Sequence, residues 1–260
     1  MPGSSKPSSR PAASAPAETN RAGERIAKYL ARAGLCSRRE AERWIAAGRV
    51  SVDGAVLDTP ATLVHAGSEI AVDGRPVEPP GRQRVWRYHK PRGLICTNAD
   101  PEGRPTVFDA LPADLPRVVT VGRLDINSEG LLLLTNDGAL AGALERGDWT
   151  RRYRVRAFGR VDEDRLAALA DGIAVDGIAY GPIRARLDSV EGRNAWLTVS
   201  LTEGRNREIK RVFESLGLAV NRLIRTGYGP FLLGGLARGA VDEVKEKVLG
   251  EQLGRADRRR

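Results

Sequence analysis

The stretch VVTVGRLDINSEGLLLLTNDG, residues 118–138, determines how the second half of the chain is organised. Two apolar runs in it, residues 118–121 and 131–134, have the length and composition of short core strands. Glycine, asparagine and serine residues between these runs favour a loop. We therefore expect Asp125 in a loop at the mouth of two core strands, where a rigid scaffold can hold a carboxylate for function. An isolated loop aspartate can equally serve as a turn cap.

Within this stretch, Gly-Arg-Leu-Asp at residues 122–125 is followed by Gly130 and by Leu-Leu-Leu-Leu-Thr-Asn-Asp-Gly at residues 131–138. This pattern resembles the catalytic motif of the RNA pseudouridine synthases, in the branch that modifies single uridines in ribosomal RNA. The one catalytic carboxylate of that family is the aspartate of this motif, and the resemblance puts it on Asp125. The departure from the family is mild, with Ser128 where threonine is common.

The chain of 260 residues carries 42 Lys and Arg against 33 Asp and Glu, a formal net charge of +9. Such a surplus predicts a polyanionic partner but does not choose between nucleic acid and an acidic membrane surface. The excess of arginine over lysine suits phosphate contacts, although a base-composition bias in the genome would produce the same excess. The length allows one large domain or two smaller ones with real cores.

The sequence lacks the features of membrane proteins, secreted proteins, metalloproteins and serine hydrolases with a catalytic triad. No apolar run approaches the length needed to cross a bilayer, and the first two dozen residues lack the apolar core of a signal peptide. We therefore expect a cytoplasmic protein that does not engage a membrane. Cys36 and Cys96 lie far apart, and His65 and His89 are the only histidines, so neither a metal site nor a Ser-His-Asp triad is expected.

Residues 23–77 have the pattern of a compact module with two helices. Apolar residues repeat at helical spacing up to Gly34, which ends the first helix. Ser37 with Glu40 three residues later forms a capping box for a second helix, which stops at Gly48. Short alternating strands follow, each ahead of an Asp-Gly turn, at residues 49–52 and 69–72.

The sequences RIAKYLARAGLCSRREAE at residues 25–42 and GRVSVDG at residues 48–54 carry a second resemblance. They are similar to the S-four RNA-binding module, named after a small-subunit ribosomal protein, over roughly residues 24–75. That module presents a helical pair and loop to structured RNA. A simply solvated basic face is the alternative. The resemblance implies RNA contacts for the cations that avoid the apolar stripe, namely Lys28, Arg32, Arg38, Arg39, Arg43 and Arg49.

A polar segment with two prolines, residues 78–84, is typical of a linker to a second domain. Near the start of that domain, His-Lys-Pro-Arg-Gly at residues 89–93 looks like the opening motif of the same synthase family. Further on, residues 148–159 alternate, so that Tyr153 faces one side of a strand and its arginine neighbours the other. A core aromatic is the plain interpretation of Tyr153. The family has a tyrosine on this strand beside the target base, and the match gives that role to Tyr153.

The segment EGRNREIKRVFESLG, residues 203–217, has four apolar residues at i, i+3, i+4 and i+7, which predicts a helix with one buried face. Lys210 lies off this face, where an exposed cation is the ordinary interpretation. The family instead has a basic residue here against the catalytic carboxylate, and Lys210 is the matching position. A family apolar side chain that lines the uracil pocket matches Leu223 or Ile224, and the sequence does not choose between them. In this domain RNA contacts are expected at Lys90, Arg123, Arg205 and Arg207.

These features predict an α+β protein. It comprises a disordered basic leader at residues 1–22, a small α/β RNA-binding module, and a larger catalytic domain at residues 85–249. The catalytic domain is expected to be built on a mixed, mainly antiparallel sheet with flanking helices. It closes with a helix over residues 241–249, and residues 250–260 form a basic tail.

Uridine isomerisation breaks the bond from ribose to the base nitrogen, turns the uracil and rejoins it through carbon. Because no redox change occurs and no group leaves for good, the resemblance implies neither a cofactor nor a metal. Asp125 would attack the sugar or remove a sugar proton, and the sequence leaves both routes open. A glycosidase would need two carboxylates that flank the bond, and Glu129 is the only nearby candidate.

The preferred interpretation is an RNA pseudouridine synthase that acts as a monomer on ribosomal RNA or a ribosome assembly intermediate. Residues 127–128 and 204–210 look most like the large-subunit branch, which favours a uridine in 23S rRNA over one in 16S rRNA. The alternative is a non-catalytic ribosomal RNA-binding or assembly factor, but Asp125 and Lys210 are both present. DNA binding is set aside, because no convincing helix-turn-helix or zinc finger is present.

Overall fold

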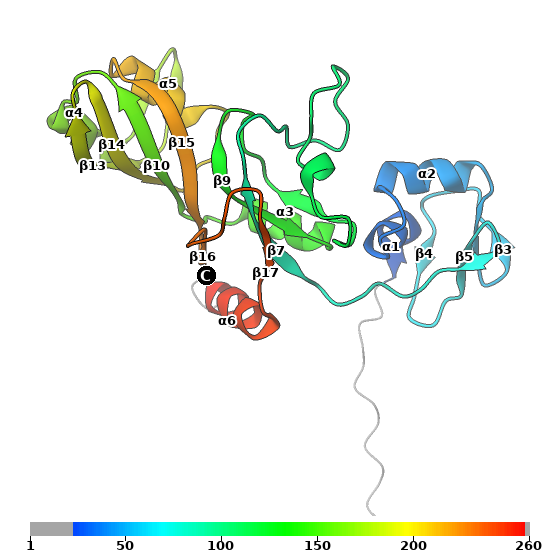
Figure 1. Ribbon diagram of the computed structural model, residues 1–260. Helices are drawn as coiled ribbons and strands as arrows, with labels where there is room; N and C mark the ends of the chain where they lie inside the picture. The colour runs from blue at the N-terminus through cyan, green and yellow to red at the C-terminus, as the bar shows by residue number, and fades with distance from the viewer. Residues whose placement is uncertain (1–22, 258–260) are drawn as a thin grey trace, which may run out of the picture. The chain divides into compact units, whose positions relative to one another are not determined.

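The computed structural model describes residues 23–257 (Figure 1). The chain divides into two compact units, Met1–Pro80 and Gly81–Arg260, and each has its own hydrophobic core. The leader that the sequence predicts at residues 1–22 and the basic end at residues 258–260 lie outside the described residues.

The N-terminal unit is a small α/β module in which two helices pack on short strands. Helix α2 begins with the predicted capping box, because Glu40 N–H donates to Ser37 Oγ at 3.1 Å and Ser37 N–H donates to Glu40 Oε2 at 3.4 Å. Ile26, Leu30 and Ile45 are buried in its core. The elements are β1 (Glu24–Arg25), α1 (Ile26–Arg32), α2 (Arg38–Ala46), β2 (Val50–Val52), β3 (Ala55–Val56), β4 (Leu63–Val64), β5 (Ile70–Val72) and β6 (Arg75–Pro76).

The strands of this module form a four-stranded sheet in the order β3-β2-β5-β6, and β1 pairs with β4. The predicted turns after β2 and β5 are confirmed, since Asp53 and Asp73 have φ of 50° and 51° and a glycine follows each. Tight hairpins require this left-handed geometry, which aspartate and glycine tolerate. The two-residue strands β1, β3, β4 and β6 are too short for a local pattern to predict.

The segment with linker composition, residues 78–84, has no regular structure. Its last residues, from Gly81 on, belong to the second unit and bond to other parts of it. Arg84 forms an ion pair with Glu243 at 2.5 Å, and Gln83 Nε2 donates to Asp137 Oδ2 at 2.8 Å. The end of this segment is therefore anchored on the second unit.

The second unit is built on a nine-stranded sheet. Seven of its strands follow the order β13-β14-β10-β15-β9-β7-β17, and the other two, β16 and β8, pair with β15 and β9. Every pairing is antiparallel except that of β9 with β15. The predicted α+β class with a mixed, mainly antiparallel sheet is thus confirmed. The elements are β7 (Val85–Lys90), η1 (Phe108–Ala110), β8 (Val119–Val121), β9 (Glu129–Thr135), α3 (Gly138–Arg146), β10 (Arg151–Phe158), α4 (Glu163–Ala168), η2 (Leu169–Asp171), β11 (Ile173–Val175), β12 (Ile178–Tyr180), β13 (Ile183–Glu191), β14 (Asn194–Leu201), α5 (Glu208–Ser215), β15 (Ala219–Tyr228), β16 (Phe231–Leu232), β17 (Val241–Glu243) and α6 (Glu246–Asp257).

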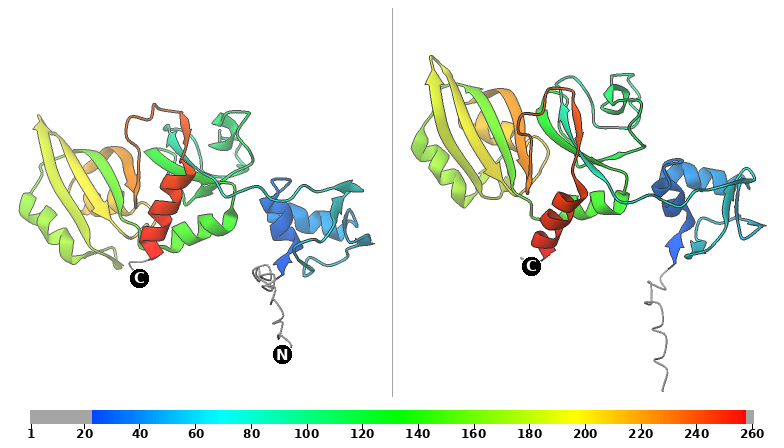
Figure 2. Two further views of the ribbon diagram at one scale, coloured as in Figure 1. Left: turned by 90° about the horizontal axis from the view of Figure 1, so that it is seen from below. Right: turned by 60° about the horizontal axis from the view of Figure 1, so that its bottom comes forward.

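Helices cover this sheet in two regions. α4 and α5 pack on one face of β13, β14, β10 and β15, where Leu166 and Phe213 share a core with Leu197 (Figure 1). α3 and α6 lie side by side near β9 and β7 (Figure 2), and Leu144 and Leu249 belong to one buried cluster there. The sheet is therefore covered by different helices at its two ends.

The closing segment differs from the sequence prediction of a helix over residues 241–249. Val241–Glu243 form β17, which pairs antiparallel with β7, and α6 begins only at Glu246. Three residues carry too short an alternation to reveal a strand, and the edge of β7 decides the outcome through pairing. α6 also runs on to Asp257, through most of the residues that the sequence assigns to a basic tail.

The parallel pairing of β9 with β15 joins the two ends of the sheet. Ile224 lies opposite Glu129, and Arg225 lies opposite Gly130. Gly130 has a φ of +106°, and a Cβ atom on it would lie 2.7 Å from Arg225 N and closer still to Arg225 O. Both the backbone conformation and the close approach of β15 therefore require glycine at this position.

Replacing Gly130 with alanine is expected to lower the free energy of unfolding by about 2–4 kcal/mol, because the methyl group must displace β15 at a strained φ. Denaturant unfolding measures this loss. Gly235→Ala is the control, since a Cβ there meets nothing within 4 Å and should change stability by less than about 0.5 kcal/mol. Equal stability of the two variants would contradict the requirement for glycine at position 130.

Candidate active site

Asp125 lies in the loop between β8 and β9, as the sequence predicts. Leu124 is buried beside it, and both its N–H and its carbonyl bond to Cys96 Sγ at 3.4 Å. On the other side, Ser128 N–H donates to the Asp125 carbonyl at 2.9 Å. The backbone is thus fixed before and after Asp125, while its side chain faces outward.

Lys90 supports this loop from inside the fold. It is fully buried at the end of β7, and burial lowers its pKa to about 8. The sequence predicts an RNA contact at Lys90, whereas in the structure its ammonium is enclosed and donates within the protein. Lys90 Nζ donates at 2.9–3.4 Å to the backbone carbonyls of Pro91, Asp125, Ile126 and Ser128.

Lys210 reaches Asp125 from helix α5. Its Nζ lies 3.4 Å from Asp125 Oδ2. The side chain of Lys210 is 14% exposed and that of Asp125 is 35% exposed, so the carboxylate is the more open member of the pair. α5 buries Ile209 and Phe213 in the core and leaves Lys210 off that face, as its apolar spacing predicts. The two opposite charges stabilise each other at this distance.

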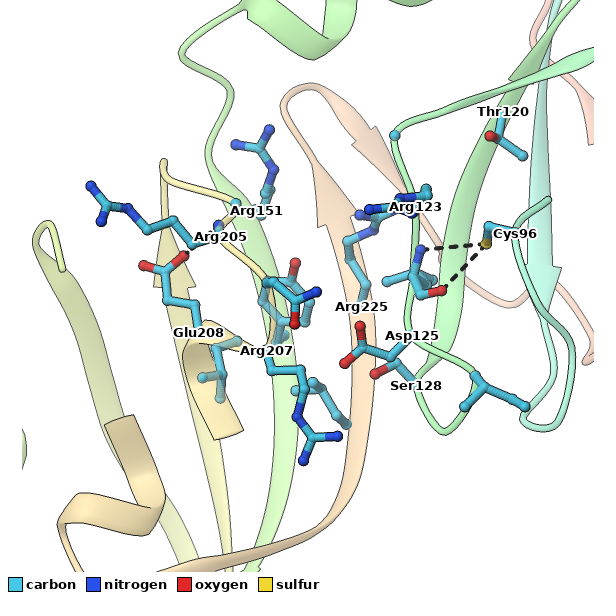
Figure 3. A pocket seen from close by; sticks show the side chains of 18 of the residues that line it. Cys96, Thr120, Arg123, Asp125, Ser128, Arg151, Arg205, Arg207, Glu208 and Arg225 are labelled. Atoms are coloured by element: carbon cyan, nitrogen blue, oxygen red, sulfur yellow. Dashed lines mark hydrogen bonds between the residues drawn. The ribbon is translucent and has the colours of Figure 1, made fainter. Parts of the chain in front are cut away.

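A cavity of about 820 Å³ opens at Asp125 (Figure 3). Tyr153 on β10 and Leu223 on β15 line it. Ile224, one residue on, packs in the other core cluster, with α3 and α6. Of the two candidates, Leu223 therefore lines the cavity and Ile224 does not. The volume is typical of a site for a small molecule or a single base.

The rim of the cavity carries three of the arginines for which the sequence predicts RNA contacts. Arg123, Arg205 and Arg207 are all exposed and all line it. In Figure 3, Arg207 and Asp125 come from opposite sides of the cavity. Arg207 has a left-handed φ of 53° just before α5, a conformation that is uncommon for residues other than glycine and recurs at functional sites.

The six cations for which the sequence predicts RNA contacts in the N-terminal unit fall into two groups. Those on α2 are exposed, whereas the other three are held by carboxylates. Glu24 binds Lys28 and Arg32 at 2.9 and 3.4 Å, and Asp73 binds Arg49 at 2.6 Å. The exposed group comprises Arg38, Arg39 and Arg43.

Three further arginines line the cavity without being predicted from the sequence: the exposed Arg104, and Arg225 and Arg151 in its wall. Arg225 is buried on β15, and its Nε donates to the Leu131 carbonyl at 2.7 Å. Arg151 is half-buried, and its Nη2 donates to Tyr228 Oη at 3.3 Å. Strand periodicity could have indicated Arg225, because it lies two residues from Leu223 and therefore on the same side of β15.

Glu208 is a buried carboxyl group in the cavity wall that the sequence analysis also misses. It is the first residue of α5, and its Oε2 accepts from Arg205 N–H at 3.0 Å. Burial raises the pKa of Glu208 to about 7, and the negative charge of Glu203 acts in the same direction. Its position three residues after Arg205 has the spacing of a capping residue, which is the signal that could have found it.

Glu129, the second carboxylate that the sequence offers, does not line the cavity. It is buried against Arg222 Nε at 2.5 Å and Arg238 Nη2 at 3.3 Å. Burial raises its pKa, but the hydrogen bond and charge of Arg222, with the charge of Arg238, outweigh burial and hold that pKa below its usual value. Asp125 and Glu129 therefore do not form the pair of carboxylates that glycoside hydrolysis needs.

Among residues 23–257, no three His, Cys, Asp or Glu side chains gather in the manner of a metal site. Within the same range, no helix has the length and apolar character needed to cross a membrane.

The pKa of Glu208 predicts a pH dependence of stability. Because its pKa is raised to about 7 in the folded chain and is near 4.5 when unfolded, the folded state binds the extra proton between these values. The stability that this proton provides is present at about pH 4.5 and is lost as pH rises through 7, by about 2–3 kcal/mol. Glu208→Gln should remove this component of the pH dependence.

Denaturant unfolding at pH 5 and pH 8 measures the difference between wild type and Glu208→Gln. The exposed Glu214 on the same helix provides the control, and Glu214→Gln should follow the wild type at both pH values. Parallel pH profiles for wild type and Glu208→Gln would show that Glu208 titrates normally.

Known proteins share both parts of the chain. Residues 24–70 match the S4 domain family, and residues 84–215 match the family described as RNA pseudouridylate synthase. A protein of Rickettsia felis named "Uncharacterized RNA pseudouridine synthase" is 46% identical over 228 residues, covering 87% of this chain and 99% of that protein. Ribosomal large subunit pseudouridine synthase B of Haemophilus influenzae is 45% identical over 250 residues, covering 92% of this chain and 70% of its own. A solved structure titled "Crystal structure of pseudouridylate synthase" has a TM-score of 0.60 and 26% identity, covering 88% of this chain and 99% of that one.

The region of the synthase match contains Asp125, Tyr153 and Lys210, and the region of the S4 match contains α1 and α2. The resemblance identified from the sequence is therefore confirmed. The chain belongs to the RNA pseudouridylate synthase family of isomerases, and it carries an S4 domain ahead of the catalytic domain.

Proposed function

We propose that this enzyme converts one uridine, or very few, of 23S rRNA to pseudouridine, with Asp125 as its catalytic carboxylate. The observation that carries the proposal is the pair of Asp125 Oδ2 and Lys210 Nζ, 3.4 Å apart, at a cavity lined by Tyr153. The names of similar proteins support the substrate, since those of Haemophilus influenzae, Pasteurella multocida and Salmonella typhi are called ribosomal large subunit pseudouridine synthase B. A uridine in 16S rRNA is the alternative substrate.

The reaction breaks the bond between ribose and the uracil nitrogen, turns the base, and joins its C5 to the ribose. C5 loses a proton and the freed nitrogen gains one, so atoms and charge balance without an external reactant. Asp125 acts at the sugar, either by attack or by removing a proton. Both routes need the negative charge of the carboxylate, which the neighbouring Lys210 ammonium stabilises.

The cavity suits a base that has left its stack. Extrusion of a base costs a few kcal/mol, and contact with the aromatic ring of Tyr153 returns part of this cost. Leu223 offers an apolar wall beside it. The exposed rim arginines Arg123 and Arg207 are available for the flanking phosphates.

The S4 domain is proposed to dock the structured RNA through the exposed arginines of α2. Arg38, Arg39 and Arg43 have no carboxylate partner within the described residues, so phosphate contacts would not first have to break an ion pair. We further propose that the enzyme acts as a monomer in the cytoplasm, on ribosomal RNA or a ribosome assembly intermediate.

Asp125→Asn is expected to lower pseudouridine formation by about 10³-fold or more while RNA affinity stays within about threefold, because the change keeps the shape and removes the charge. Turnover on a 23S rRNA transcript and filter binding measure the two quantities. Asp114→Asn, at an exposed position outside the cavity lining, is the control and should retain full activity. An inactive wild-type protein with intact RNA binding would instead favour a non-catalytic assembly factor.

A strain that lacks this gene is expected to lose one pseudouridine, or very few, from 23S rRNA and none from 16S rRNA. Chemical mapping of pseudouridine in both RNAs measures this. Wild-type protein should restore the missing site, and the Asp125→Asn protein should not. A site that vanishes from 16S rRNA or a transfer RNA, with 23S rRNA unchanged, would overturn the proposed substrate and leave the chemistry intact.

A further inference from the structure

The face of the sheet opposite the cavity carries a cluster of arginines. Along β10, the residues that alternate with the core point to this face, and along β13 the same alternation holds. The pairing register aligns them across β14, since Arg154 and Arg186 both lie opposite Thr198, and Arg152 and Arg184 both lie opposite Ser200. We call this surface the arginine face, and it comprises Arg152, Arg154, Arg156, Arg184 and Arg186.

The arginine face is open to solvent within the described part of the chain. α4 and α5 cover the other side of these strands (Figure 1), where Val155 and Leu197 are buried. Four members of the arginine face are exposed, and Arg156 is half-buried. A sheet face that carries several exposed side chains of one charge is not suited to pack against a protein core.

Aromatic rings accompany the arginines on this face. Arg154 lies over the ring of Trp196 on β14, with 4.7 Å from Cζ to the ring centre, and Arg193 lies over Phe158 at 4.6 Å. Trp196 is half-buried, and Phe158 is exposed. A guanidinium group placed over a ring is attracted by the face of that ring, and its N–H groups can still donate hydrogen bonds to a ligand.

Few carboxylates neutralise this charge. Asp188 binds Arg186 at 2.7 Å and also accepts from Thr198 Oγ1 at 2.7 Å, and Glu191 lies at the end of β13. Within the described residues, Arg154 and Arg184 take part in no ion pair. Clustered like charges repel one another, so a face of this kind gains stability from an anionic partner.

We propose that the arginine face binds the sugar–phosphate backbone of the RNA substrate at a distance from the target nucleotide. The proposal rests on the proposed function, which supplies a large polyanion as substrate. Arginine forks match phosphate geometry, and the aromatic rings of Trp196 and Phe158 are of the kind that contact unpaired bases. Because Asp125, Tyr153 and Lys210 serve the opposite side of the sheet, this contact adds affinity without touching the reacting atoms.

The test compares two triple variants with the same change in charge. The face variant carries Arg154→Gln, Arg184→Gln and Arg186→Gln. The control variant carries Arg146→Gln, Arg160→Gln and Arg165→Gln, which are exposed arginines outside the arginine face. Binding to an unmodified 23S rRNA transcript is measured between 50 and 300 mM KCl, together with KM and kcat for pseudouridine formation.

The face variant should bind about tenfold more weakly than wild type near 0.1 M salt, and its plot of log K against log salt should be less steep by about 2, as expected for three lost phosphate contacts. KM should rise while kcat at saturating RNA falls by less than about twofold. The control variant should stay within about twofold of wild type with the full slope. Trp196→Leu should weaken binding without changing the slope, since it removes contact area but no charge.

Equal affinity and equal slope for the face and control variants would overturn the proposal and leave the arginine face to a partner other than RNA. This outcome is distinct from a failure of the proposed function, in which wild-type enzyme forms no pseudouridine in the transcript. The binding comparison does not require turnover, so it tests RNA binding by the arginine face whether or not the wild-type protein forms pseudouridine.

Discussion

The geometry of the site depends on the parallel pairing of β9 with β15. Asp125 lies just ahead of β9, and Lys210 lies on α5, the helix that leads into β15. Because the two strands run in the same direction, their entry points lie at the same edge of the sheet. Two residues separated by 85 positions therefore meet at 3.4 Å. An antiparallel pairing would carry them to opposite edges, so the absence of a side chain at Gly130, which admits β15, is part of the arrangement that brings Lys210 to Asp125.

Buried cations stabilise the irregular backbone on both sides of this junction. Lys90 donates to several carbonyls of the Asp125 loop, of which that of Asp125 also accepts from Ser128 N–H, and Arg225 donates to the Leu131 carbonyl of β9. Removing a charged group from water costs several kcal/mol, whereas each unpaired buried carbonyl would cost about 1–3 kcal/mol. One ammonium that serves several carbonyls offsets much of its own desolvation. The Asp125 loop can therefore stay irregular and keep its carboxylate open without losing its fixed position.

Local patterns in the sequence predict the elements but not the contacts between them. The capping box of Ser37 and the apolar runs around Asp125 each depend on a few neighbouring residues, and the structure confirms them. β17 depends on the edge of β7, which lies some 150 positions earlier in the chain, so nothing near Val241 reveals it.

The side of a strand on which a residue lies is predictable from local sequence for some residues and only from the fold for others. Leu223 and Ile224 are equivalent by composition, and only the pairing of β15 with β10 and β9 shows which one faces Tyr153. For Lys90, by contrast, the sequence does indicate the orientation, because Lys90 alternates with the buried Trp86 and Tyr88 along the strand. The prediction of an RNA contact at Lys90 followed the family motif at residues 89–93 instead of this alternation. The proposed site residues Asp125, Tyr153 and Lys210 were predicted by resemblance, whereas the distances between them required the fold.

The distribution of charge over the catalytic domain separates chemistry from affinity. Inside the cavity, one aromatic contact returns about 1–3 kcal/mol, which is comparable with the cost of extruding a base and leaves little to select a single site in a large RNA. Interactions remote from the reacting atoms must supply the remainder, and binding energy gained there can be used to hold the target nucleotide in the cavity. A genome rich in arginine codons would scatter arginines over all surfaces. On β10, however, Arg152, Arg154 and Arg156 alternate with Tyr153, Val155 and Ala157, and Arg152 and Arg154 align across β14 with Arg184 and Arg186 of β13. This alignment, rather than the net charge, is what makes the opposite face of the sheet a candidate for RNA recognition.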